Sequence, residues 1–284
     1  PQSDADYIAD SMATIYATKR VTPTGNGFNN IRRININAAP MSIENLRKLW
    51  RAGIGTYQVF QETYHRERYA ELHPAHTVKG NFRWRLYAMH RAMDAGIDDV
   101  AIGALFGLYD WRFEVMGLVH HAHDLERQFG IGPHTISFPR MQPAPGSFVS
   151  ENSPYLVKDD AFKRIVTVLR LAVPYTGLIV TARERADLRR EIIHYGCTQT
   201  DASSKIGIGA YAQKKRQDEN PDKVQFMLGD ERSLDEVVRE LATDGYITSF
   251  CTAGYRCGRT GDKIMTLLGK GIEAVSYTHL TLPT

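Results

Sequence analysis

Apolar and polar residues follow one recurring unit along the chain. Each unit is an amphipathic stretch, a glycine and a short β-rich run, as in MSIENLRKLWRAG before IGTYQVFQ and SLDEVVRELATDG before YITSFCT. Within the amphipathic stretches, apolar side chains recur at the i, i+3, i+4 and i+7 spacing of a helix, as Leu234, Val237, Val238 and Leu241 do. Glycines are expected to end these helices as C-caps at Gly53, Gly96, Gly130, Gly196 and Gly245.

The regular alternation of β-rich runs and helices predicts a parallel sheet. With IRRININA before the first complete unit, seven runs are candidate strands. No GxGxxG motif follows a strand, so a dinucleotide-binding fold is not indicated. We therefore predict an α/β fold, a partial (β/α)8 barrel whose first unit is expected upstream of Pro1.

Polar side chains gather where the predicted strands end, which is where barrel enzymes place their chemistry. These positions are Asn35, Asn37, Gln61, Glu62, Thr63, His65, Arg140, Thr181, Arg183, Glu184, Ser203 and Ser204. The third strand ends instead in Gly103 and Gly107, where the backbone allows the close approach of a flat ligand. Two arginines, a glutamate, amides and hydroxyls at one mouth suit a zwitterion, because a guanidinium matches a carboxylate. An amino-acid-like ligand is therefore expected. His134 differs, since it opens a strand and so belongs at the opposite end of the barrel.

Composition narrows the class of protein. The 284 residues are 43% hydrophobic and 24% charged with a net charge of +3, and their charges are interleaved. This balance is globular and argues against a nucleic-acid partner. No apolar run reaches the roughly 18 residues of a membrane span. Three cysteines do not form a disulfide framework, and the acidic, amphipathic start does not suit a signal peptide. We expect a cytoplasmic protein.

Five motifs carry a resemblance to a known family: QETYH, IGALFGL, GPHTISFPR, PYTGLIVTARE and FCTAGYRCGRTGDKIM. From about Asp4 to Ala274 the chain resembles the radical SAM tyrosine lyases. The barrel motifs are common to the branch of thiamine biosynthesis and the branch that matures FeFe-hydrogenase. The last motif resembles the corresponding segment of the hydrogenase-maturase branch.

The resemblance implies a radical SAM barrel with a C-terminal cluster-binding extension. A 4Fe-4S cluster would cleave S-adenosyl-L-methionine (SAM), and the resulting radical would split the Cα–Cβ bond of L-tyrosine into p-cresol and dehydroglycine. In the maturase branch, a second 4Fe-4S cluster with an extra iron would yield carbon monoxide and cyanide. Other hydrogenase maturation proteins would then be partners. The barrel would span residues 1–212, with a biotin- and thiamin-synthesis-associated region at about 140–212. Residues 213–274 would hold the last barrel unit and the start of the extension, and 275–284 resemble an adapter-derived tail.

The resemblance also implies roles for individual residues. Arg183 and Thr181 would bind the tyrosine carboxylate. Another set would lie near SAM: Asn35, Asn37, Gln61, Glu62 and Gly103. His134 would bind the extra iron, and Cys251 with Cys257 would be the metal ligands of the second cluster.

Two departures from the family pattern affect these expectations. The CxxxCxxC motif of the SAM cluster is expected upstream of Pro1, so the chain alone is expected to be inactive. The family's CTAC reads CTAG here, with Gly254 in place of a cysteine. Three interpretations stay open: Cys257 replaces the ligand, the second site is degenerate, or Gly254 is a sequencing error. A 2-iminoacetate synthase of thiamine biosynthesis and a cluster-free amino-acid-binding barrel are the alternative functions.

Overall fold

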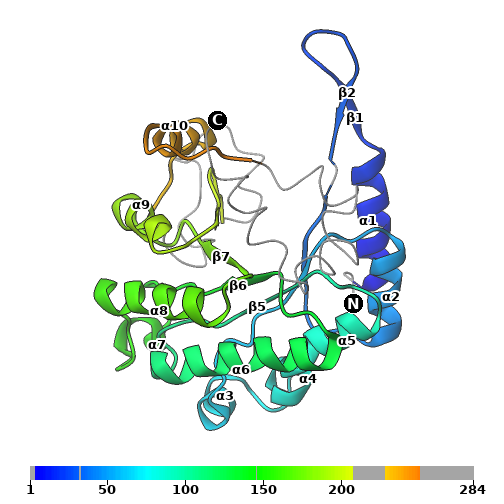
Figure 1. Ribbon diagram of the computed structural model, residues 1–284. Coiled ribbons are helices and arrows are strands. Elements are labelled where there is room, and N and C mark those ends of the chain that lie inside the picture. The colour runs from blue at the N-terminus through cyan, green and yellow to red at the C-terminus, as the bar shows by residue number, and fades with distance from the viewer. Residues whose placement is uncertain (1–3, 32, 145, 207–227, 250–284) are drawn as a thin grey trace.

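A curved parallel sheet is the centre of the molecule (Figure 1). The computed structural model describes residues 4–31, 33–144, 146–206 and 228–249. In this part of the chain the sheet runs in the order β3-β4-β5-β6-β7-β8, each strand parallel to its neighbour. The strands are β3 (Ile36–Asn37), β4 (Tyr57–Gln58), β5 (Val100–Gly103), β6 (Thr135–Ser137), β7 (Gly177–Val180) and β8 (Gln199–Thr200). Sequential order with parallel pairing is the arrangement of a partial barrel, which confirms the predicted fold class.

Helices connect the strands and cover the outer face of the sheet (Figure 1). The longer ones are α1 (Ala5–Ala17), α2 (Ile43–Arg51), α6 (Trp111–Phe129), α8 (Asp159–Ala172), α9 (Ala186–His194) and α10 (Leu234–Thr243). The shorter ones are α3 (Arg66–Leu72), η1 (Val78–Gly80), α4 (Phe82–Leu86), α5 (Ala88–Asp94) and α7 (Phe148–Asn152). All five predicted C-cap glycines have a positive φ, between 76° and 111°, as a left-handed helix end requires.

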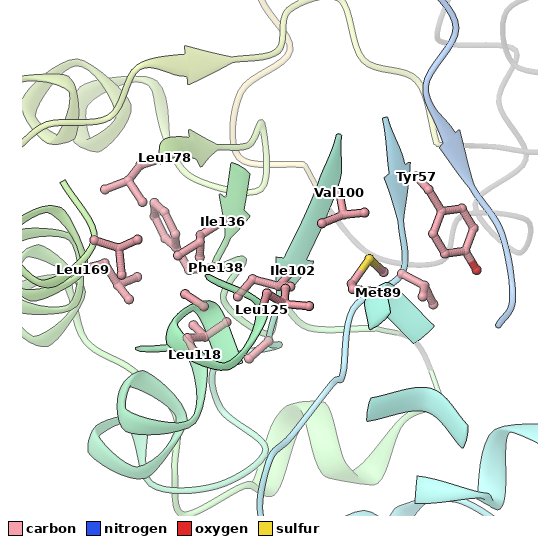
Figure 2. Close-up of a cluster of buried hydrophobic side chains, with 14 of the residues drawn as sticks. Tyr57, Met89, Val100, Ile102, Leu118, Leu125, Ile136, Phe138, Leu169 and Leu178 are labelled. Carbon is pink, nitrogen blue, oxygen red and sulfur yellow. The ribbon is translucent and has the colours of Figure 1, made fainter. Parts of the chain in front are cut away.

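Side chains from the strands and the helices meet in one core, shown in Figure 2. Leu118 and Leu125 of α6 and Leu169 of α8 are fully buried against the sheet. Ile102 and Ile136 meet them from β5 and β6. Because β5 and β6 are buried at every residue and α6 and α8 each bury one face, the core fixes how these helices cover the sheet.

The structure departs from the predicted elements in three places. An antiparallel hairpin of β1 (Lys19–Val21) and β2 (Phe28–Asn30) projects from the body of the fold (Figure 1). Every residue of both strands is exposed, so no buried alternation marked them in the sequence. The helical stretch that ends at the predicted C-cap Gly96 is divided into α4 and α5 at Tyr87. The seventh candidate strand, YITSFCT, does not form a strand at 246–249, and its last residues lie outside the described ones.

Most of the predicted extension at 213–274, and all of the tail at 275–284, lies outside the described residues. Among the helices of the described segments, none combines the length and the apolar character that a bilayer crossing requires.

Candidate functional site

Arg183 and Glu62 bring opposite charges to the carboxyl ends of two strands. Arg183 follows β7, and Glu62 follows β4. Burial lowers the pKa of the Arg183 guanidinium, while the charges of Glu62 and Glu184 raise it to a smaller extent. The carboxylate of Glu62 forms ion pairs of 2.9 Å with Lys79 and of 2.9 Å with Arg85. A partly desolvated arginine at this edge suits an anionic ligand group such as a carboxylate.

The backbone at Glu62 is held in an unusual conformation. Its φ of 73° lies in the left-handed region, which costs a non-glycine residue about 1 kcal/mol or more. Bonds on both sides hold the turn: the Leu105 N–H donates to the Glu62 carbonyl at 2.8 Å, and Arg85 Nε donates to the Phe60 carbonyl at 2.6 Å. The pairing of β4 with β5 therefore continues past the strands and fixes the position of Glu62.

Two buried polar side chains near this edge have no hydrogen-bond partner among the described residues. Gln61 is 3% exposed, and both atoms of its amide are unbonded. The hydroxyl Oγ1 of Thr181, next to the end of β7, is also buried and unbonded. Because such groups cost about 1–3 kcal/mol when left unsatisfied, they are candidate partners for a ligand or a bound water. An amide and a hydroxyl fit the polar groups of SAM or of an amino acid.

Arg140 does not share the surroundings of Arg183, although both arginines line one cavity of about 770 Å³. Arg140 Nε donates to both carboxylate oxygens of Glu184 at 3.0 Å, and Nη1 donates to Asp159 at 2.9 Å. Its guanidinium also lies 4.6 Å from the centre of the Phe162 ring. Glu184 lines the same cavity, but Arg140 and Glu184 bond to each other, so their contact with a ligand stays a prediction.

Asn35 lies at the amino end of the sheet and not at the carboxyl end, where it was expected, and its role toward SAM stays a prediction. It precedes β3, and its Oδ1 accepts bonds from the Thr56 N–H at 3.0 Å and from Arg33 Nε at 3.0 Å. Arg33 in turn forms an ion pair with Asp99, which precedes β5. Asn37 is an exposed residue within β3. Its role toward SAM stays a prediction.

Gly103 is required by the protein's own packing. A Cβ at this position would lie 2.6 Å from the Ser137 carbonyl oxygen and 2.7 Å from the Phe60 ring. Both contacts are too close for any side chain, so the ring of Phe60 takes the space that a Cβ would need. The predicted contact of Gly103 with SAM is not tested by this packing.

His134 lies at the amino end of the sheet, as its place before β6 predicts. The backbone N–H of His134 donates to the Val100 carbonyl at 2.9 Å. Burial lowers the pKa of its imidazole, with a smaller opposing effect of Asp99. Within the described segments, no group of three or more His, Cys, Asp or Glu residues could hold a metal ion. The role of His134 toward an extra iron stays a prediction.

The predicted cluster ligands Cys251 and Cys257 lie outside the described residues, as does Gly254. Cys197 is described and buried, and burial raises the pKa of its thiol. It serves as a small apolar core residue, so it does not substitute for the cluster ligands.

Several contacts near the mouth were not predicted. The Glu114 carboxylate on α6 accepts bonds from Thr63 Oγ1 and, at 2.8 Å, from the Tyr64 N–H. The segment that begins at Leu228 crosses the end of β7, where the Gly229 N–H donates to the Ala182 carbonyl at 2.9 Å. The sequence pattern could have indicated that Glu114 is buried, because it lies four residues before Leu118 on the same face of α6.

Known proteins resemble this chain over most of its length. The Biotin and Thiamin Synthesis associated domain matches residues 137–247. The 2-iminoacetate synthase of Salmonella typhimurium (strain LT2) is 31% identical over 214 residues, which are 75% of this chain and 54% of that protein. The 2-iminoacetate synthase of Escherichia coli (strain K12) is 29% identical over the same shares. The chain thus spans about half the length of these curated relatives.

Solved structures of FeFe-hydrogenase maturases also resemble this chain. HydG, a maturase of the FeFe-hydrogenase, is 46% identical, with a TM-score of 0.83 over 94% of this chain and 55% of its own. The HydG of Carboxydothermus hydrogenoformans is 39% identical, with a TM-score of 0.74 over 98% of this chain and 61% of its own. The resemblance inferred from the motifs is confirmed: the chain is similar to the tyrosine lyases of the radical SAM class. Within that class, its identity to HydG is higher than to either 2-iminoacetate synthase.

Proposed function

We propose that the chain is the substrate-binding part of a radical SAM lyase that cleaves L-tyrosine into p-cresol and dehydroglycine. The dehydroglycine would serve the synthesis of carbon monoxide and cyanide for FeFe-hydrogenase maturation. The observation that carries the proposal is the partly desolvated Arg183, which follows the unbonded hydroxyl of Thr181 by two residues and experiences the charge of Glu62. The likeness to HydG supports it.

In this proposal the chain's own residues bind and orient the reactants. Arg183 holds the tyrosine carboxylate in a charge-assisted pair, and Thr181 donates its unused hydroxyl beside it. Gln61 offers both a donor and an acceptor to SAM, and the Glu62 carboxylate suits the ammonium of an amino-acid moiety. When bound, SAM and its 4Fe-4S cluster supply the radical chemistry, while the barrel holds the tyrosine in place and excludes water.

The 2-iminoacetate synthase activity of thiamine biosynthesis is the second candidate, because two proteins of that name match 75% of the chain. The two candidates share the first reaction and differ in the fate of dehydroglycine. A second 4Fe-4S cluster with an extra iron, held by Cys251, Cys257 and His134, belongs to the maturation proposal alone. Carbon monoxide or cyanide released by the holoenzyme would select maturation, and glyoxylate as the sole second product would select the synthase.

Equilibrium dialysis with labelled L-tyrosine tests the carboxylate clamp in the chain itself. We expect Arg183→Met to weaken binding about 10- to 100-fold, since a hydrogen-bonded charge pair contributes roughly 1.5–3 kcal/mol. Arg185→Met is the matched control, because the Arg185 side chain is 57% exposed and pairs with Asp159 and Asp187. Equal affinity of wild type and Arg183→Met would contradict the proposed role.

A further inference from the structure

Helix α6 holds the turn that follows β4 through a buried carboxylate. Glu114 lies in the first turn of α6 and is completely buried. One of its oxygens accepts the bond from Thr63 Oγ1, and the other accepts the bond from the Tyr64 N–H at 2.8 Å. Thr63 Oγ1 also accepts from the His65 N–H at 3.1 Å. The carboxylate therefore bonds the turn at two consecutive residues.

The side chain of Tyr64 lies along the same face of α6. A Cβ on Gly117 would stand 2.4 Å from the Tyr64 ring, so only glycine allows this contact. The Tyr64 hydroxyl shares a hydrogen bond of 2.8 Å with Nδ1 of His121. Glu114, Gly117 and His121 follow each other at helical spacing, and we refer to these three residues as the α6 latch.

The latched turn carries the groups that face the mouth. Glu62, with its left-handed backbone, directly precedes Thr63, and the unbonded amide of Gln61 precedes Glu62. A left-handed glutamate persists only where its surroundings determine it. The Leu105 N–H holds this turn from the sheet side, Arg85 of α4 holds it at the Phe60 carbonyl, and Glu114 holds it from α6.

We infer that Glu114 is a positioning residue, which acts through Thr63 and Tyr64 to hold Gln61 and Glu62 in their ligand-facing arrangement. For its effect on ligand binding, the inference rests on the proposed function. In this inference Glu114 acts on the turn and not on a ligand, because its carboxylate reaches from α6 to Thr63 and Tyr64.

A purely structural helix residue would not need a buried carboxyl here. Burial raises the pKa of Glu114 to about 7, against smaller opposing effects of the Thr63 and Tyr64 bonds, and Asp110 adds to the rise. The buried carboxyl therefore destabilises the fold near neutral pH, where an apolar residue of similar volume would not. This cost fits a residue retained for the two bonds that it makes to the turn.

Hydrogen exchange followed by mass spectrometry tests the latch without any ligand. We expect Glu114→Ala to accelerate exchange at least about tenfold in peptides that cover the Tyr64 and Leu105 amides. Glu114→Gln should keep rates near those of wild type, because its carbonyl can accept from Tyr64 and its amide can donate to Thr63. Leu118→Ala is the control for general destabilisation, since Leu118 lies on the same helix in the core.

Three outcomes of this experiment would overturn the inference. They are unchanged rates in Glu114→Ala, equal acceleration of the same peptides in Leu118→Ala, and Glu114→Gln exchanging as fast as Glu114→Ala.

Dialysis with L-tyrosine on the same variants then separates the inference from the proposed function. We expect Glu114→Ala to bind at least about fivefold more weakly than wild type, with Glu114→Gln and Leu118→Ala close to wild type. If wild type binds and Glu114→Ala binds equally well, the inference fails and the function stands. If wild type does not bind tyrosine, the proposed function fails, while the exchange rates still decide whether Glu114 holds the turn.

Discussion

Arg140 and Arg183 follow neighbouring parallel strands and line the same cavity, yet their surroundings differ. Burial by itself acts to lower the pKa of both guanidinium groups. At Arg140, the bonds and charges of Glu184 and Asp159 outweigh burial and raise its pKa above the ordinary value. At Arg183, burial prevails and the pKa is lowered. Nearby carboxylates that bond a strand-end arginine therefore decide whether ion pairing or burial sets the direction of its pKa shift.

The largest expected effect comes from Arg140→Met. This change leaves Glu184, which is 2% exposed, buried without its cation. Breaking a buried pair from one side costs about 3–5 kcal/mol, so the free energy of unfolding should fall by this amount in urea denaturation. Adding Glu184→Leu should recover part of the loss, because the double variant buries no lone charge. A loss of stability below about 1 kcal/mol in the single variant would show that the pair of Arg140 with Glu184 is not needed for the fold, which contradicts the proposed difference between the two arginines.

A pH scan sharpens the comparison, because both arginines keep their charge near neutral pH and Glu114 does not. The pKa of Glu114 rises from an ordinary 4.5 to about 7 in the folded state. The folded state therefore binds more protons than the unfolded state between these values, and stability falls as pH rises through that window. The shift corresponds to about 3 kcal/mol at most.

The measurement is the difference in unfolding free energy between wild type and Glu114→Gln from pH 4.5 to 8. We expect this difference to shift against wild type as pH rises and to level off above pH 8. A difference that stays constant across the range would show that Glu114 does not titrate there.

The smallest effect on stability is expected for Arg183→Met. Because Arg183 is partly desolvated and its pKa is lowered, removing its charge should change the free energy of unfolding by less than about 1 kcal/mol. The same variant should lose tyrosine binding, which Arg140→Met does not address directly. Arg140 would then contribute to stability and Arg183 to tyrosine binding. A fall of several kcal/mol in the unfolding free energy of Arg183→Met would instead show that Arg183 also stabilises the fold.

Sequence reasoning predicted the parts of the fold that periodicity determines. The C-cap glycines and the amphipathic helices carry local signals, and all five glycines hold the expected left-handed backbone. The β1–β2 hairpin carries no such signal, since its exposed strands bury no face. Asn35 was misplaced because β3 is only two residues long, so the sequence did not show which polar neighbour precedes the strand.

The candidate site was predictable as far as it depends on strand ends. Thr181 and Arg183 follow β7 directly, so their place at the carboxyl edge came from the strand pattern. The pairing of Arg140 with Glu184 depends on a contact between residues 44 positions apart, which no local pattern shows. Glu114 was missed because charged residues on helices are usually solvated, although its place on the apolar stripe was visible.

The left-handed backbone of Glu62 has a consequence for protein engineering. Glycine adopts this conformation without steric cost, so Glu62→Gly would relieve the strain of the backbone. The same change would remove the carboxylate that pairs with Lys79 and Arg85 and whose charge reaches Arg183. A redesign that relaxes this turn would therefore give up the ion pairs and the charge that the strained residue supplies.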